Sequence, residues 1–258
     1  MNIDLPVAEL IAGLLATIRV SAWLVVAPPF SNRGIPSLVK VALAMAIALP
    51  LTPRLAAQAP SAELGPLLTA VLFQVVVGLS LGFLTQLLFA AVQAAGELID
   101  FFSGFTLASA FDPGSNISVS VFGRFYQLVA VTLLFALNGH LLLLRGFVGS
   151  FTVFPMHPVS IGILTRTVTE NVGTLVVSSL EIAAPVLIVL FLAELALGLV
   201  NRAVPALNVL VMSFPVKILL TLSLTGIAVT ALPGVVQFLL DHINTAIGSA
   251  APGIGGTP

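Results

Sequence analysis

Residues 96–126 read GELIDFFSGFTLASAFDPGSNISVSVFGRFY and interrupt a chain that is otherwise strongly apolar. The stretch lies near the middle of the chain, with long apolar segments on both sides. It contains Glu97, Asp100 and Asp112, three of only ten acidic residues. A polar, glycine-bearing stretch between hydrophobic helices is either a water-exposed connection or part of a pathway, and the rest of the sequence has to decide between them.

The centre of this stretch has the composition of a tight turn. In DPGS (112–115), Pro113 presets φ at the second turn position, and Gly114 supplies the positive φ of a type II turn. Asp112 and Asn116 are suited to hydrogen-bond the backbone around it. The surrounding phenylalanines are Phe101, Phe102, Phe105 and Phe111. Solvent-facing connections seldom keep so many rings, so we expect the turn to be packed inside an assembly.

Composition identifies the class of protein. Of 258 residues, 59% are hydrophobic and 7% are charged, and the mean hydropathy is +1.18. Soluble domains have about 25% charged residues, so this composition predicts an integral membrane protein. The net charge of −1 argues against nucleic-acid binding and against a basic surface anchor. The absence of cysteine excludes disulfides and thiolate metal sites.

The apolar segments predict an all-α, polytopic membrane protein, as a single domain over residues 1–247 with a disordered tail over 248–258. The expected helices cover 5–27, 37–49, 66–102, 124–144, 171–200 and 205–240, with polar connections over 28–36, 52–65 and 145–170. A spanning helix needs about 20 residues, so 37–49 is too short and fits a re-entrant or buried hairpin. Residues 66–102 would extend about 50 Å, beyond a hydrocarbon core of about 30 Å.

The long helix carries an ordered set of polar and small residues. At about 100° per residue, its polar members fall within an arc of about 60°, with glycines on the flank. The polar members are Gln86, Gln93, Glu97 and Asp100, and the glycines are Gly78, Gly82 and Gly96. Such a stripe is expected where helices approach closely or hydrogen-bond to partners.

Catalytic motifs are weak in this chain. GLSLG (78–82) matches the nucleophile-elbow pattern around Ser80, but that motif requires a strained strand-to-helix turn. The same glycines match G-x-x-x-G, which favours helix packing. His140, His157 and His242 lack the spacing of metal ligands. We therefore expect no enzymatic activity, no cofactor and no metal.

Four charges interrupt the apolar segments: Arg19, Glu181, Glu194 and Lys217. Such charges can mark a proton or ion path, or they can pair with one another or with neighbouring subunits. A charge at the bilayer centre costs about 2.5–3.5 kcal/mol or more, so Arg19 should face protein or water. Glu181 and Glu194 should face nearly opposite sides of their helix, which suits two separate contacts.

Three motifs in order resemble a known family. They are AAGELIDFFSGFTLASAFDPGSN (94–116), ALNGHL (136–141) and NRAVPALNVLVMSFPVKILL (201–220). They resemble the R/T-type export gate subunits of type III secretion, a family that includes the flagellar FliR proteins and their injectisome counterparts. The resemblance covers nearly the whole chain. The FDPGSN and NGHL motifs are similar to those of the flagellar branch.

The resemblance implies a fold and a site. Such subunits look like a fused P-like and Q-like fold of helical hairpins with broken and non-spanning helices. The loop that matches residues 104–120 helps to plug the protein-conducting pore. The implied plug residues are Phe105, Phe111, Asp112, Pro113, Gly114, Ser115 and Asn116. The partner and helix-packing residues predicted from the polar stripe, the glycine spacing and the third motif are Gly78, Gly82, Gln86, Gln93, Glu97, Asp100, Arg202 and Lys217.

The resemblance also implies partners and a location. The partners are P-type and Q-type gate subunits, the B-type switch protein, the A-type export platform protein and unfolded flagellar substrates. The expected location is the bacterial inner membrane within the flagellar basal body, in a part of the assembly raised towards the periplasm. The alternatives are an injectisome gate subunit, a secondary transporter or proton channel, and an intramembrane hydrolase.

A substitution in the turn tests the plug. Replacing Gly114 with a bulky or charged residue should disturb the turn, because the third position of a type II turn requires positive φ. We expect increased ion leakage through the assembled gate, measured alongside flagellar export. Unchanged leakage and unchanged export would count against this prediction.

Overall fold

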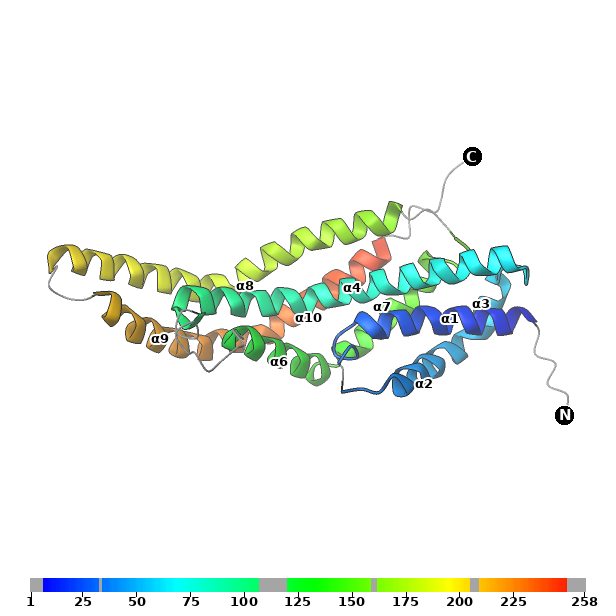
Figure 1. Ribbon diagram of the computed structural model, residues 1–258, viewed down its shortest axis with the longest axis horizontal. Helices are drawn as coiled ribbons and strands as arrows, with labels where there is room; N and C mark the ends of the chain where they lie inside the picture. The colour runs from blue at the N-terminus through cyan, green and yellow to red at the C-terminus, as the bar shows by residue number, and fades with distance from the viewer. Residues whose placement is uncertain (1–6, 33, 107–119, 159–161, 205–208, 250–258) are drawn as a thin grey trace. The chain divides into compact units, whose positions relative to one another are not determined.

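The computed structural model describes residues 7–32, 34–106, 120–158, 162–204 and 209–249 (Figure 1). Every regular element in these ranges is a helix. Five helical stretches are long and apolar enough to cross a membrane, and a sixth counts if the bent pair α6 and α7 forms one span. The prediction of an all-α, polytopic membrane protein is therefore confirmed. The plug residues from Phe111 to Asn116 and the tail from 250 onwards lie outside the described residues.

The helix bounds are as follows. The α-helices are α1 (Val7–Val26), α2 (Ser37–Ala48), α3 (Thr52–Leu55), α4 (Leu64–Ser103), α6 (Val121–Ala136), α7 (Gly139–Val153), α8 (Gly162–Ala203), α9 (Val209–Ala228) and α10 (Leu232–Ser249). Short 3-10 turns, η1 (Leu49–Leu51), η2 (Ala56–Gln58) and η3 (Val229–Ala231), join some of them. The chain forms two compact units: Met1–Leu87 with His140–Val172 and Leu240–Pro258, and Leu88–Gly139 with Gly173–Leu239. The single-domain boundary at residue 247 stays a prediction.

The second apolar segment is longer than expected. After α2, the chain stays helical through η1, α3 and η2, so that Ser37–Gln58 forms a candidate span of 22 residues. Pro50 and Pro53 are the second residues of η1 and α3. In the first turn of a helix the backbone N–H has no partner within the helix, so a proline there removes no hydrogen bond. The predicted loop over 52–65 is therefore wrong for residues 52–58. The prediction that this segment is too short to span a membrane is wrong, because the continuous helical stretch has 22 residues.

Helix α4 has 40 residues and extends about 60 Å. Two of its glycines permit close contact with α1 in the first unit. A Cβ atom added to Gly78 would overlap the backbone carbonyl of Arg19, and one added to Gly82 would lie 2.9 Å from the Val26 Cβ. The G-x-x-x-G spacing thus serves α1–α4 packing. Ser80 lies inside this helix, which is not the strand-to-helix turn that a nucleophile elbow needs.

Two further segments depart from the sequence expectation. The single segment over 124–144 is bent by 78° between α6 and α7, at Asn138, whose φ is 56°. Asparagine tolerates this left-handed conformation, and Gly139 follows it. Helix α8 begins at Gly162, so the expected connection up to residue 170 is helical in its last part. The polar residues of this part predicted a loop, and that prediction is wrong for residues 162–170.

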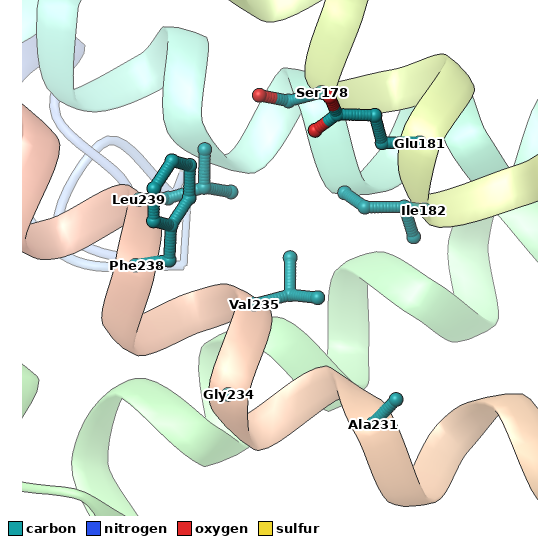
Figure 2. A pocket seen from close by; sticks show the side chains of 8 residues that line it. All are labelled: Ser178, Glu181, Ile182, Ala231, Gly234, Val235, Phe238 and Leu239. Atoms are coloured by element: carbon teal, nitrogen blue, oxygen red, sulfur yellow. The ribbon is translucent and has the colours of Figure 1, made fainter.

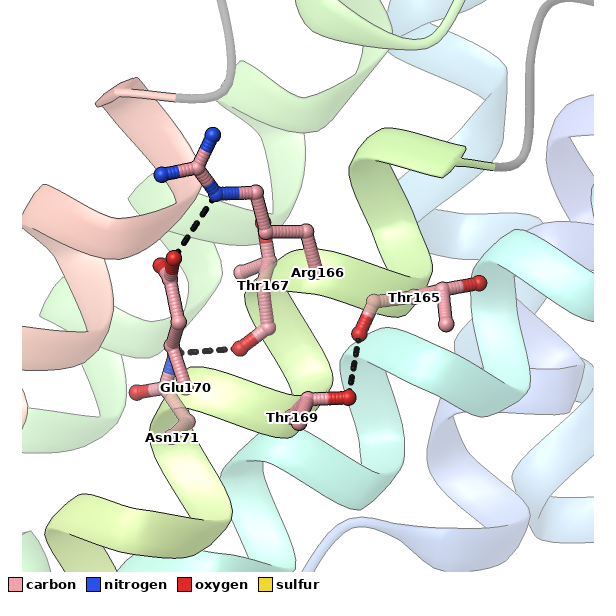
Figure 3. Close-up of polar contacts among 6 residues, drawn as sticks. All are labelled: Thr165, Arg166, Thr167, Thr169, Glu170 and Asn171. Atoms are coloured by element: carbon pink, nitrogen blue, oxygen red, sulfur yellow. Dashed lines mark hydrogen bonds and ion pairs between the residues drawn. The ribbon is translucent and has the colours of Figure 1, made fainter.

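The start of α8 is polar and yet helical because its side chains bond within the helix (Figure 3). The Arg166 Nε donates to Glu170 Oε1 at 2.7 Å, and the Asn171 Nδ2 donates to the Thr167 carbonyl at 2.8 Å. The Thr169 hydroxyl donates to the carbonyl of residue 165 at 2.9 Å. The ion pair is exposed and four residues apart, so it contributes a few tenths of a kcal/mol.

Arg19 lies in the core of the first unit and is fully buried. Its Nε donates to Gln74 Oε1 at 2.6 Å, and its Nη2 donates to the carbonyl of Phe154 at 2.6 Å and to that of Pro155 at 3.2 Å. The Ser150 hydroxyl accepts a longer bond of 3.5 Å from Nη1. The prediction that Arg19 faces protein or water is confirmed. These bonds join α1, α4 and the end of α7.

The partners of Arg19 are neutral. Phe154 and Pro155 follow the last residue of α7, where backbone carbonyls carry partial negative charge. The guanidinium carbon also lies 4.1 Å from the centroid of the Phe151 ring, a cation–π arrangement. Gln74 completes the cluster by donating its Nε2 to the carbonyls of Pro155 and Met156. The positive charge is thus held by dipoles and a ring.

We expect Arg19→Met to destabilise the first unit by about 3–5 kcal/mol, because buried carbonyls and an amide would lose their charged donor. The measurement is the midpoint of thermal unfolding in detergent. Arg54→Met is the matched control, because Arg54 is exposed in the same unit. Equal midpoints for the two variants would contradict a structural role for Arg19.

Candidate functional site

The sequence places its candidate site in the loop between α4 and α6. Of the implied plug residues, the structure describes Phe105; Phe111, Asp112, Pro113, Gly114, Ser115 and Asn116 lie outside the described residues. The two ends of the loop are described, and both belong to the second unit. We call them the loop base: residues 96–106 at the end of α4, and 120–126 at the start of α6.

The Asp100 carboxylate joins the two ends of the loop. Its Oδ2 accepts hydrogen bonds from the Ser120 hydroxyl, from the Phe122 N–H at 2.9 Å and from the Gly123 N–H at 3.5 Å. Asp100 is only 2% exposed. These amides are the unpaired donors at the N-terminus of α6, where the helix dipole favours negative charge. The carboxylate therefore caps one helix while it belongs to another.

Ser120 acts in the same cap. It is the residue before α6, and its Oγ accepts from the Gly123 N–H at 2.9 Å. Serine is a preferred residue at this position because its short hydroxyl reaches the exposed amides of the first turn. Sequence reasoning missed this contact. A serine directly before an apolar periodic run was the available signal.

Two glycines of the loop base permit close contacts, Gly96 with the backbone of α6 and Gly104 with a ring on α9. A Cβ atom added to Gly96 would lie 2.6 Å from the Phe122 carbonyl carbon, so a larger residue would displace α6. Gly104 has a φ of +87°, which L-residues rarely adopt. Its added Cβ would also lie 2.8 Å from the Phe214 ring on α9. Both positions therefore require glycine for close approach.

Aromatic packing continues from the base. The rings of Phe105 and Phe122 meet edge to face, with centroids 5.3 Å apart. Both rings line an apolar hollow of about 480 Å³ that also contacts Phe125 on α6 and Leu222 on α9. The first residue of the implied plug is thus fixed by ring contacts.

The polar stripe on α4 divides into two parts. Gln86, Gln93 and Glu97 are exposed or half-buried, and the Gln93 Nε2 donates to Glu97 Oε1 at 2.8 Å. Asp100 is instead buried in the cap of α6. The exposed part of the stripe lacks a cover within the described residues, and its role towards partners stays a prediction.

The remaining implied residues lie on α8 and α9. The Lys217 ammonium forms an ion pair with the Glu194 carboxylate, which joins α9 to α8. The expected pairing of intramembrane charges therefore holds for these two. Arg202 is exposed in the last turn of α8. Within the described residues, no group of three His, Asp or Glu side chains is arranged to hold a metal ion.

We expect Asp100→Asn to weaken the loop base by about 1.5–3 kcal/mol, because an amide replaces a charged acceptor for three donors. The readout is hydrogen exchange at the amides of Phe122 and Gly123, which should accelerate. Glu97→Gln is the matched control, since Glu97 is exposed on the same helix and accepts a hydrogen bond from Gln93. Unaltered exchange in Asp100→Asn would contradict the cap.

Comparisons with known proteins identify the family of this chain. The sequence profile of the family described as "Bacterial export proteins, family 1" matches residues 10–243. The flagellar biosynthetic protein FliR of Escherichia coli is 33% identical over 232 residues, which cover 89% of this chain and 87% of the relative. The FliR protein of Bacillus subtilis is 32% identical over 212 residues, covering 80% and 82%.

A virulence protein matches over a shorter range. The Yop proteins translocation protein T of Yersinia pestis is 29% identical over 147 residues, which cover 56% of each chain. These relatives are export proteins rather than enzymes. Because the profile and the FliR relatives cover most of its length, the chain belongs to the FliR family of bacterial export proteins.

Proposed function

We propose that this chain is a structural subunit of the flagellar type III protein export gate, and that residues 104–120 help to plug its protein-conducting pore. The observation that carries the proposal is the match to flagellar FliR along 89% of the chain. The match to the virulence protein extends over 56% of the chain. The flagellar role is therefore favoured over the injectisome role.

The loop base supports the plug in physical terms. A segment that closes a pore has to be held firmly at its ends, so that substrate displaces the segment and not the surrounding helices. Asp100 and Ser120 bond the two ends together, and Gly96 allows their backbones to touch. The proposed mechanism is steric: the phenylalanine-rich loop closes the pore at rest and yields to an unfolded flagellar protein driven from elsewhere in the machine.

The internal charges argue against a transporter. A proton or ion path needs ionisable groups that face a water-filled cavity. Arg19 is instead enclosed by neutral hydrogen-bond acceptors, and Lys217 is paired with Glu194. Three of the four charges that could mark a pathway are thus engaged in contacts within the protein. Membership of a family of bacterial export proteins also argues against a transporter of ions or small solutes.

The proposed assembly follows from the family resemblance. The chain would combine with P-type and Q-type gate subunits, and the B-type switch protein and the A-type platform protein would act at the entrance. Its apolar helices favour the bacterial inner membrane, with a part of the gate raised towards the periplasm. The exposed apolar residues along α8, such as Phe191 at 58% and Leu199 at 69%, are available for partners or lipid.

Two measurements test the function together. Deletion of the gene should abolish swimming, and complementation with the wild-type chain should restore it. Phe105→Ala should raise ion leakage through the assembled gate, because the ring of Phe105 holds the start of the loop against Phe122. Phe83→Ala is the matched control, because Phe83 is an exposed phenylalanine on α4 outside the loop base.

The outcomes separate the alternatives. Swimming that survives deletion, with loss of protein secretion into host cells, would assign the chain to an injectisome. Solute or proton flux from the purified chain alone in liposomes would support a transporter. Leakage that is unchanged in Phe105→Ala would contradict the proposed contribution of this ring to the seal.

A further inference from the structure

Helix α8 carries more charge than a membrane segment tolerates without partners. Its longest uncharged run after Glu170 is the 12 residues between Glu181 and Glu194. A hydrocarbon core requires about 20 residues of helix. Any such length within the candidate span Leu164–Ala203 therefore includes Glu181 or Glu194. Each of these carboxylates needs a cation or a polar cavity at that depth.

The two carboxylates on α8, Glu181 and Glu194, differ in whether they have a partner. Glu194 is paired with Lys217, as described above. Glu181 is exposed, and within the described residues it forms no hydrogen bond or ion pair. Its cation is therefore missing from the described part of the chain, although the helix around it is strongly apolar. Val177 and Leu180, which precede it, are 55% and 49% exposed.

Glu181 borders an apolar groove in the second unit (Figure 2). The groove has a volume of about 350 Å³, and α8 forms one side with Ile182 while α10 forms the other with Val235 and Phe238. Ser178 and Glu181 project from α8 in the same direction, at one edge of the groove. The groove is therefore apolar along its length and acidic at one edge.

The side of the groove opposite α8 has small residues that would let another helix approach closely. Ala231 and Gly234 lie there, and a Cβ atom added to Gly234 would meet no other atom within 4 Å. Small residues on a helix face allow a second helix to come near, which is the usual geometry of helix pairs in membranes. Phe238, which is 59% exposed, lies beside them.

We propose that this groove, between α8 and α10, is the docking site for an apolar membrane helix of another export-apparatus subunit, and that a lysine or arginine of that helix pairs with Glu181. Charge complementarity selects the occupant, because an unpaired carboxylate in an apolar setting is matched best by a cation brought in by the partner. The proposal concerns a surface separate from the pore loop, so its failure would leave the proposed plug untouched.

The first test is assembly of the full chain with the other export subunits of its own organism, co-expressed and purified in detergent. Glu181→Gln keeps the size of the side chain and removes the charge. We expect the amount of co-purified partner to fall about tenfold, the effect of losing about 1.4 kcal/mol of binding free energy. Glu170→Gln is the matched control on the same helix, because Glu170 pairs with Arg166 outside the groove. Wild-type assembly of Glu181→Gln would overturn the proposal.

The second test leaves Glu181 intact, so it does not depend on the folding of that variant. The chain has no cysteine, so Val235→Cys gives a unique attachment point for a benzophenone probe. Photolysis in the assembled complex should attach the probe to an apolar helix of another subunit, within two turns of a lysine or arginine. Attachment to lipid, to a second copy of this chain, or to a helix without a basic residue would overturn the proposal.

A charge exchange completes the test. Glu181→Lys should prevent assembly, and replacing the basic residue found by the probe with glutamate should restore it. Restoration by the paired exchange requires that the two side chains meet, which a general loss of stability would not reproduce. Failure of every such exchange, with both single variants present in the membrane at wild-type levels, would overturn the pairing.

Discussion

Polar groups in an apolar chain have to find their partners inside the protein, and this constraint governs the structure. Water is absent from the hydrocarbon region, so each buried donor or acceptor left unpaired costs several kcal/mol. Arg19 meets the constraint with Gln74 and two backbone carbonyls. Asp100 meets it with the open amides of α6. In both clusters one charged side chain joins helices that are far apart in sequence.

The two clusters supply partners to opposite ends of helices. A helix leaves carbonyls unpaired at its C-terminus and amides unpaired at its N-terminus. The guanidinium of Arg19 binds carbonyls just past the end of α7, and the carboxylate of Asp100 binds amides at the start of α6. Each charge therefore also has the sign that the helix dipole favours. Opposite helix termini thus explain why one site needs a cation and the other an anion.

The class of fold and the length of α4 followed from the sequence, because hydropathy and helical periodicity are properties of single segments. The sequence did not predict the helical structure of residues 52–58. Proline was taken to end the helix there, although it fits the first turn of a helix. The bend at Asn138 and the early start of α8 at Gly162 were missed for a related reason. They depend on local φ values and side-chain bonds that composition alone leaves open.

The candidate site was predictable in part. The resemblance identified the loop, and helical periodicity placed Asp100 in a polar stripe that was expected to face partners. The structure separates it from Glu97 because the backbones of Gly96 and Gly123 approach closely and place the α6 amides over Asp100. Such an approach between residues more than twenty positions apart is a tertiary property. Periodicity along one helix contains no information about it.

The cap formed by Asp100 also has an entropic consequence. Its carboxylate bonds to Ser120, twenty residues later, and so closes a loop. Bringing the ends of a flexible segment of about twenty residues together costs on the order of 2–3 kcal/mol of chain entropy. The chain meets that cost when the second unit folds, through the bonds and ring contacts at the base. If the segment acts as the proposed plug, its displacement would leave these ends joined, so its return would require no new loop closure.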